Sequence, residues 1–138
     1  METKETKEIK RALIKETYKK IGCYGAFEVT VGDQRCDYVE YNGTDFTCYE
    51  IKVSWSDLNS KNKQTYLGKR NYLVVTDALA LKIDEEHYGL GGVGLIAYKN
   101  DKFKLLKKCS LHRVSFATNA ALLDGFAKAA SRDLMKQY

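Results

Sequence analysis

The chain has 138 residues, a net charge of +5 and 44% hydrophobic residues, which is typical of one globular domain with a single core. No apolar run approaches the roughly 18 residues of a membrane span, and the first residues hold no apolar signal segment, so we expect a cytoplasmic protein without a membrane partner. The modest positive charge favours a polyanionic partner such as nucleic acid without requiring one.

A helix followed by three antiparallel strands is predicted for the first half of the chain. Residues 3–21 repeat apolar side chains at the helical period, with Glu16 on or beside the apolar stripe. Two turns follow, and the second contains the strong hairpin signal Asn42-Gly43. These turns separate three strands, which we expect at residues 26–31, 35–41 and 46–53.

Period-two alternation predicts which strand residues share a face. In the first strand it places Phe27 and Val29 on one side and Glu28 on the other. In the second strand it groups Arg35 and Asp37 with Val39.

Helices and strands alternate in the predicted second half. A polar, helix-forming stretch covers residues 54–68, and a short strand at residues 71–76 is apolar enough to be buried on both faces. Asp77 is predicted to cap a helix that ends near His87. A hairpin and a last helix complete the chain, at residues 94–99, 102–108 and 117–136. The last helix is expected to face inward with Leu122, Leu123, Phe126, Ala130 and Leu134.

The candidate site consists of Asp37, Glu50 and Lys52. Residues two apart in a strand project from one face about 6.5 Å apart, so Glu50 and Lys52 should stand side by side. On the neighbouring hairpin strand, Asp37 would bring its carboxylate to that of Glu50. Two carboxylates and an ammonium in one cleft are costly unless a divalent cation lies between the acids. Such a trio is the minimum equipment for metal-assisted phosphodiester hydrolysis.

The same trio has a plain structural alternative. The tripeptide pattern E-x-K occurs four times, and only the copy at Glu50 has strand-forming neighbours. An Asp–Glu–Lys group on a sheet face can be a cross-strand ion pair worth under about 1 kcal/mol.

The predicted order of elements resembles that of the PD-(D/E)XK nuclease superfamily. The shared core of that superfamily is a helix, a three-stranded meander, a crossover helix and a fourth strand. Cys36-Asp37 stands in the place of its "PD", and Glu50-Ile51-Lys52 in the place of its "(D/E)XK".

More narrowly, residues 26–75 are similar to the MmcB-like DNA-repair family. Glu28, Arg35 and Asp37 fit its first part, and residues 53–58 fit the segment after its lysine. Three positions depart from that family's pattern: Gln34, Lys61 and Gln64.

The resemblance implies an α/β fold with a restriction-endonuclease-like core in a single domain, residues 1–138. It implies a Mg²⁺- or Mn²⁺-dependent nuclease that hydrolyses DNA, in DNA repair or in the DNA metabolism of a phage or mobile element. The metal ligands would be Asp37, Glu50 and the carbonyl of Ile51. Lys52 would orient the attacking water or stabilise the phosphate oxygens, and Glu28 or Glu16 would complete the site. Small size and one site per chain suggest a homodimer if both strands of a duplex are cut.

The predicted contacts with DNA come from five side chains around and after the motif: Arg35, Ser54, Lys61, Lys63 and Tyr66. Such contacts to phosphate would give salt-dependent, sequence-independent binding, whereas the plain alternative is an exposed helix with ordinary charges. Two other functions stay open: a nuclease-like fold that binds nucleic acid without cutting it, and a partner-binding protein with an incidental ion-pair cluster.

Overall fold

The structure is a computed structural model that describes residues 2–61 and 64–138. In chain order its elements are α1 (Lys4–Tyr18), β1 (Tyr24–Val31), β2 (Gln34–Tyr41), β3 (Phe46–Lys52), α2 (Trp55–Leu58), β4 (Arg70–Thr76), α3 (Asp77–Glu85), β5 (Gly94–Lys99), β6 (Lys102–Lys107) and α4 (Phe116–Met135). The predicted α/β class is confirmed.

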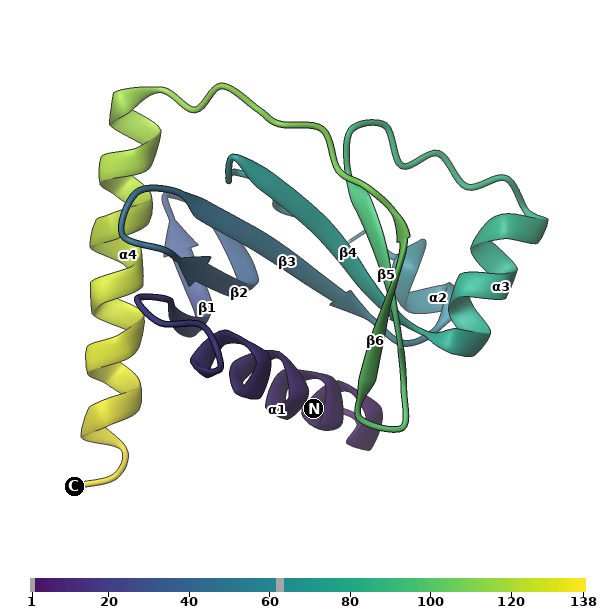
Figure 1. The fold of residues 1–138 in the computed structure, drawn as a ribbon, viewed down its shortest axis with the longest axis horizontal. Helices are drawn as coiled ribbons and strands as arrows, with labels where there is room; N and C mark the ends of the chain where they lie inside the picture. Colours follow the sequence, from purple (N-terminus) through teal and green to yellow (C-terminus); the bar gives the residue numbers. More distant parts are fainter. Residues whose placement is uncertain (1, 62–63) are drawn as a thin grey trace.

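The described strands form one six-stranded sheet in the order β1-β2-β3-β4-β5-β6 (Figure 1). Strands β1, β2 and β3 form an antiparallel meander, β4 and β5 run parallel to β3, and β6 returns antiparallel to β5. Helices α2 and α3 lie in the two connections that join the parallel strands. The sheet is therefore mixed, with its two parallel pairings in the middle.

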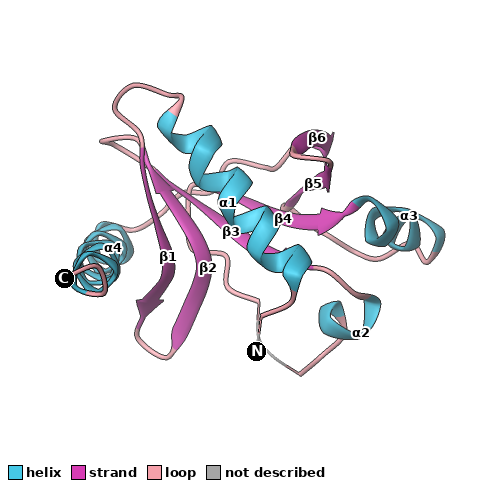
Figure 2. Cartoon of the chain, turned by 90° about the horizontal axis from the view of Figure 1, so that it is seen from below, coloured by secondary structure: helices cyan, strands magenta, loops and turns pink. Residues whose placement is uncertain are grey.

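Helix α1 covers one face of the sheet. Its Ile9 and Leu13 pack in one buried cluster with Tyr38, Ile51 and Val74 of β2, β3 and β4. Figure 2 shows α1 crossing the sheet, with α4 beside β1 at one end and α3 at the other.

The opposite face is covered in two separate places. Leu122 and Phe126 of α4 pack with Cys36 and Cys48 near the β1 end. A second cluster, formed by α2, α3, β4 and β5, lies near the other end and includes Leu58, Leu73, Val75, Leu79 and Ile83. Because residues paired across strands share a face, Glu50 and Lys52 point the same way as Leu73 and Val75, into the space between these two helical groups.

Close approach explains a glycine within α4. A Cβ atom at Gly125 would lie 2.3 Å from the carbonyl oxygen of Thr30, so only glycine lets α4 lie this close to β1. The inward face of α4 differs from the predicted one, because its buried positions are Leu122, Gly125, Phe126 and Ala129. Leu123, Ala130 and Leu134 were predicted to face inward and are exposed instead.

Among the described residues, the predicted helix over residues 54–68 is wrong beyond Leu58, where α2 ends. Thr65 is fully buried, and its carbonyl oxygen lies 3.8 Å from the sulfur of Cys36. The segment therefore returns along the sheet rather than continuing as a solvated helix. The cap of α3 also differs, because the side chain of Thr76, not Asp77, accepts the N–H of Leu79.

The alternation expected in β1 and β2 is broken at Glu28 and Asp37. Phe27 packs on the α1 side with Tyr38, whereas Val29 packs on the α4 side. Glu28 has a φ of 52°, a left-handed conformation that is uncommon outside glycine. The predicted grouping of Phe27 with Val29 is therefore wrong.

The matching break in β2 lies directly opposite. Val39 faces α4, although alternation grouped it with Asp37, which lines a cleft that also includes residues of α1. The register pairs Phe27 with Tyr38 and Val29 with Cys36, so Glu28 and Asp37 face each other across the strands. Irregularities of this kind often re-aim side chains beside functional sites.

Candidate functional site

Asp37 and Glu50 meet where β2 and β3 begin to separate. The regular pairing of these strands ends at Tyr38 and Tyr49, and the two acids occupy the next positions. There the carboxylate of Asp37 accepts the backbone N–H of Ile51 at 2.8 Å, in place of a strand partner. The carboxyl group of Glu50 lies beside that of Asp37, and each perturbs the pKa of the other. The hairpin thus brings together the two acids that the sequence singled out.

The site is unusually well shielded for a group of charged residues. Glu50 is 3% exposed and Lys52 is 7% exposed. Among the described residues, none offers a hydrogen bond to Oε1 of Glu50. A buried carboxylate oxygen without a donor is costly, so this atom is suited to a bound cation.

Burial dominates the electrostatics of the two acids. Loss of hydration, together with the charge of Asp37, raises the pKa of Glu50 to about 9. Burial also raises the pKa of Asp37, against the opposing effects of the Ile51 N–H and the Lys52 ammonium. Without a cation the pair therefore retains a proton near neutral pH, and a divalent cation would favour its release.

Two neighbouring cavities that share lining residues give access to this pair. One of 530 Å³ opens beside the start of α1, and one of 360 Å³ opens beside the β1–β2 turn and Thr65. Arg35, Asp37 and Lys52 line both cavities, whereas Glu50 lines the smaller one. We call the two cavities together the cleft. Its lining holds six acidic and three basic side chains: Glu2, Glu28, Asp33, Asp37, Glu50 and Asp57, with Lys10, Arg35 and Lys52. An excess of acids favours a cation in the cleft.

Lys52 lies beside the acids, and its ammonium contacts a carboxylate that the sequence analysis did not assign to the site. Its Nζ lies 3.5 Å from Oδ1 of Asp57 in α2. Ser54 caps this short helix by accepting the backbone N–H of Asp57 at 3.1 Å. The chain thus turns back over Lys52 directly after β3. The only sequence signal for this contact is the short spacing between Lys52 and Asp57.

Glu28 and Arg35 form the outer part of the cleft. Oε1 of Glu28 lies 4.0 Å from the guanidinium of Arg35, and both side chains are substantially exposed. Glu16, the alternative acid, instead pairs with Lys19 on the exposed face of α1 and does not line the cleft. Of these two acids, the structure therefore brings Glu28 to the site.

The structure places only some of the five predicted DNA-contacting residues in the cleft. Arg35 and Ser54 line the cleft. Lys61 is exposed and does not line it, and Tyr66 is half-buried with its hydroxyl donating to Gln64 at 2.6 Å. Lys63 lies outside the described residues. The cleft also includes Thr3, Thr6 and Lys10, which no sequence signal indicated.

The metal-donor set is small. Within residues 2–61 and 64–138, no group of three or more His, Cys, Asp and Glu side chains is placed to hold a metal ion. The available donors are two carboxylates and the nearby carbonyl of Ile51. These hard oxygen donors suit Mg²⁺ or Mn²⁺, which keep several water ligands.

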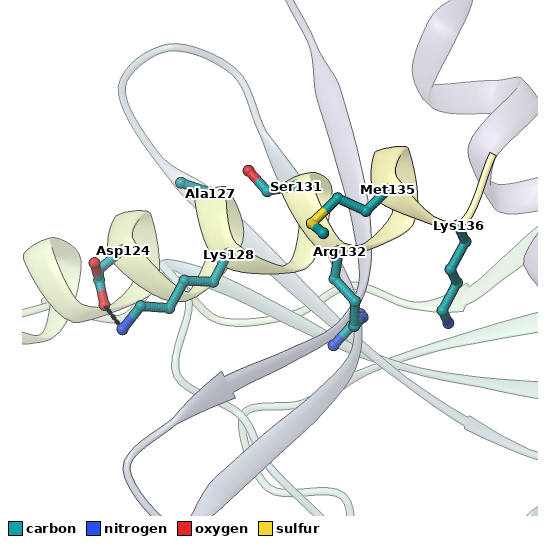
Figure 3. Close-up of a pocket in the computed structure, with 7 residues that line it drawn as sticks. All are labelled: Asp124, Ala127, Lys128, Ser131, Arg132, Met135 and Lys136. Carbon is teal, nitrogen blue, oxygen red and sulfur yellow. Dashed lines mark ion pairs between the residues drawn. The ribbon is translucent and has the colours of Figure 1, made fainter. Parts of the chain in front are cut away.

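A separate groove of 610 Å³ runs along the outer side of α4 (Figure 3). Two of its cations have partners: Lys128 pairs with Asp124 at 2.8 Å, and Arg132 donates to the carbonyl of Phe27 at 2.9 Å. The groove shares no lining residue with the cleft. It contributes nothing to the candidate site.

Comparison with known proteins places the fold without a function. No family model matches the chain, and no curated protein matches it. A solved structure, the SPO1766 protein of unknown function from Silicibacter pomeroyi, is similar over 97% of this chain and 91% of its own, with a TM-score of 0.76 and 18% identity. At this identity the likeness shows a shared fold only. Across the part of the chain that the structure describes, we find no helix with the length and apolar character needed to cross a membrane.

Proposed function

We propose that this protein is a Mg²⁺- or Mn²⁺-dependent nuclease that hydrolyses DNA phosphodiester bonds on a restriction-endonuclease-like core. The observation that carries the proposal is the meeting of Asp37 and Glu50 in the cleft, with Lys52 beside them and a buried carboxylate oxygen that none of the described residues partners. A simple cross-strand ion pair would not leave a buried carboxylate oxygen without a donor among the described residues. A role in DNA repair or in the DNA metabolism of a phage or mobile element belongs to the same proposal.

The residues around the two acids have distinct tasks. Asp37 and Glu50 hold the cation, and the N–H of Ile51 keeps Asp37 in place at 2.8 Å. When bound, the cation lowers the pKa of a coordinated water and offsets charge on the phosphate. Lys52 donates hydrogen bonds to the nonbridging phosphate oxygens, where negative charge develops. Arg35, exposed at the rim, contacts a neighbouring phosphate, and Glu28 keeps Arg35 near the acids.

A cleavage assay tests the proposal. Purified protein is incubated with plasmid and with single-stranded DNA in Mg²⁺, in Mn²⁺ and in EDTA, alongside the variants Asp37→Asn and Glu50→Gln. Cleavage should require the metal and be lost in both variants, while binding to DNA at low salt persists. Glu16→Gln is the matched control, because it removes an acid that lies outside the cleft. Cleavage that survives in EDTA, or in both site variants, would exclude this mechanism.

The second candidate is a nuclease-like module that binds DNA without cutting it. The small donor set favours it, since two carboxylates among the described residues hold a cation less firmly than three. DNA binding without cleavage in the same assay would support this candidate. Absence of both would support a partner-binding protein. Gel filtration with and without duplex DNA would show whether a homodimer forms.

A further inference from the structure

Asp57 forms an ion pair with Lys52, and this contact affects where the Lys52 ammonium lies relative to Asp37 and Glu50. Oδ1 of Asp57 lies 3.5 Å from Nζ of Lys52, and its side chain is 40% exposed at the edge of the cleft. Asp37 and Glu50 line the smaller cavity together with Lys52, whereas Asp57 lines only the larger one. Lys52 therefore shares both cavities with acidic groups.

We propose that Asp57 is a positioning residue that holds the Lys52 ammonium away from the metal-binding acids. The inference rests on the proposed nuclease function and extends it to a residue outside the catalytic motif. A lysine has a flexible stem of four carbons and a mobile point charge. Without Asp57, the carboxylates of Asp37 and Glu50, which share the smaller cavity with Lys52, are available to that charge. An ammonium placed between them would occupy the position that the cation needs.

The local structure favours this role over one in folding. The cap of α2 uses the backbone N–H of Asp57, which every substitution except proline retains. The side chain of Asp57 is partly exposed, so its removal leaves no buried cavity. Variants at this position should therefore fold normally and alter the position of Lys52.

The proposal predicts a specific effect on the metal requirement. In Asp57→Ala the half-saturating Mg²⁺ concentration should rise about two- to fivefold, the range expected for loss of one partly exposed ion pair. The KM for DNA should stay constant or fall, because a negative charge leaves the path of the phosphate. Asp57→Glu should restore most of the wild-type metal requirement, and Asp57→Asn should fall between the two.

Mg²⁺ binding is measured by titration calorimetry in the absence of DNA and compared with the Mg²⁺ dependence of cleavage. Asp77→Asn is the matched control, because Asp77, like Asp57, lies in the first turn of a helix that follows a strand, and it lies 3.9 Å from a lysine, Lys99, outside the cleft. Weaker Mg²⁺ binding in Asp57→Ala, with Asp77→Asn unchanged, would support the proposal. If wild type cleaves DNA and Asp57→Ala binds Mg²⁺ equally well, the positioning role is wrong and the nuclease function stands. If wild type neither binds Mg²⁺ nor cleaves DNA, both are wrong.

Discussion

Replacing Glu50 by glutamine should stabilise the metal-free protein at alkaline pH. Burial and the charge of Asp37 raise the pKa of Glu50 from 4.5 to about 9. Between these values the folded protein retains a proton that the unfolded chain releases. The contribution of Glu50 to the stability of the wild type is therefore greatest below the pKa that Glu50 has in the unfolded chain. This contribution falls as the pH rises toward the pKa of Glu50 in the folded protein.

The size of the effect follows from the width of that window. One pH unit within it corresponds to at most about 1.4 kcal/mol of unfolding free energy. At about pH 7.5, three units above the unfolded value, the ceiling is about 4 kcal/mol. Because Asp37 and Glu50 share the bound proton, the measured effect should be smaller, about 1–3 kcal/mol. Glutamine avoids the penalty, since it carries no charge and its amide can donate to Asp37.

Urea unfolding followed by circular dichroism measures this difference in EDTA at about pH 5 and pH 8. Glu50→Gln should be more stable than the wild type at pH 8, and the difference in their unfolding free energies should be smaller at pH 5. Glu16→Gln, an exposed acid on α1, should stay within about 0.5 kcal/mol of wild type at both values. Addition of Mg²⁺ should stabilise wild type and leave Glu50→Gln unchanged. Parallel pH dependences for wild type and Glu50→Gln would refute the reasoning about burial.

Two further substitutions test other parts of the structure. Arg35→Ala removes a side chain that is 62% exposed at the edge of the cleft, so DNA binding should weaken about equally for all sequences. The slope of the logarithm of the binding constant against the logarithm of salt concentration, measured by fluorescence anisotropy, should fall by about one. An unchanged slope would show that Arg35 does not contact the DNA. Gly125→Ala forces α4 away from β1, because the new Cβ would lie 2.3 Å from the carbonyl oxygen of Thr30. The cost should be about 1–3 kcal/mol in thermal unfolding, and a wild-type Tm would show that α4 packs more loosely than described.

Local signals predicted the hairpins correctly. Asn42-Gly43 lies in the connection between β2 and β3, where Gly43 has a φ of 91°. Asn100 and Asp101 join β5 to β6 with φ values of 50° and 62°. Turn conformations of this kind depend on a few adjacent residues, so the amino acids themselves indicate them.

Longer-range packing explains the main errors. Polar residues after Ser54 suggested a helix to residue 68, yet Thr65 is buried against the sheet beside Cys36. Alternation misplaced Val29 and Val39, because the strands are irregular at Glu28 and Asp37. The burial of Thr65 and the irregularity of the two strands both depend on residues that are distant in the sequence, so local sequence patterns do not predict them.

In the candidate site, too, local sequence signals predicted some features and long-range packing determined the others. A strand spacing of two was enough to place Glu50 beside Lys52, and a hairpin was enough to bring Asp37 opposite Glu50. Only the tertiary structure revealed the ion pair between Lys52 and Asp57, the exclusion of Glu16 and the depth at which the acids lie. The pKa of a carboxyl group depends on the water removed around it, and the removal of water depends on how separate segments pack. Amino-acid spacing therefore identifies the acids, whereas packing determines their protonation.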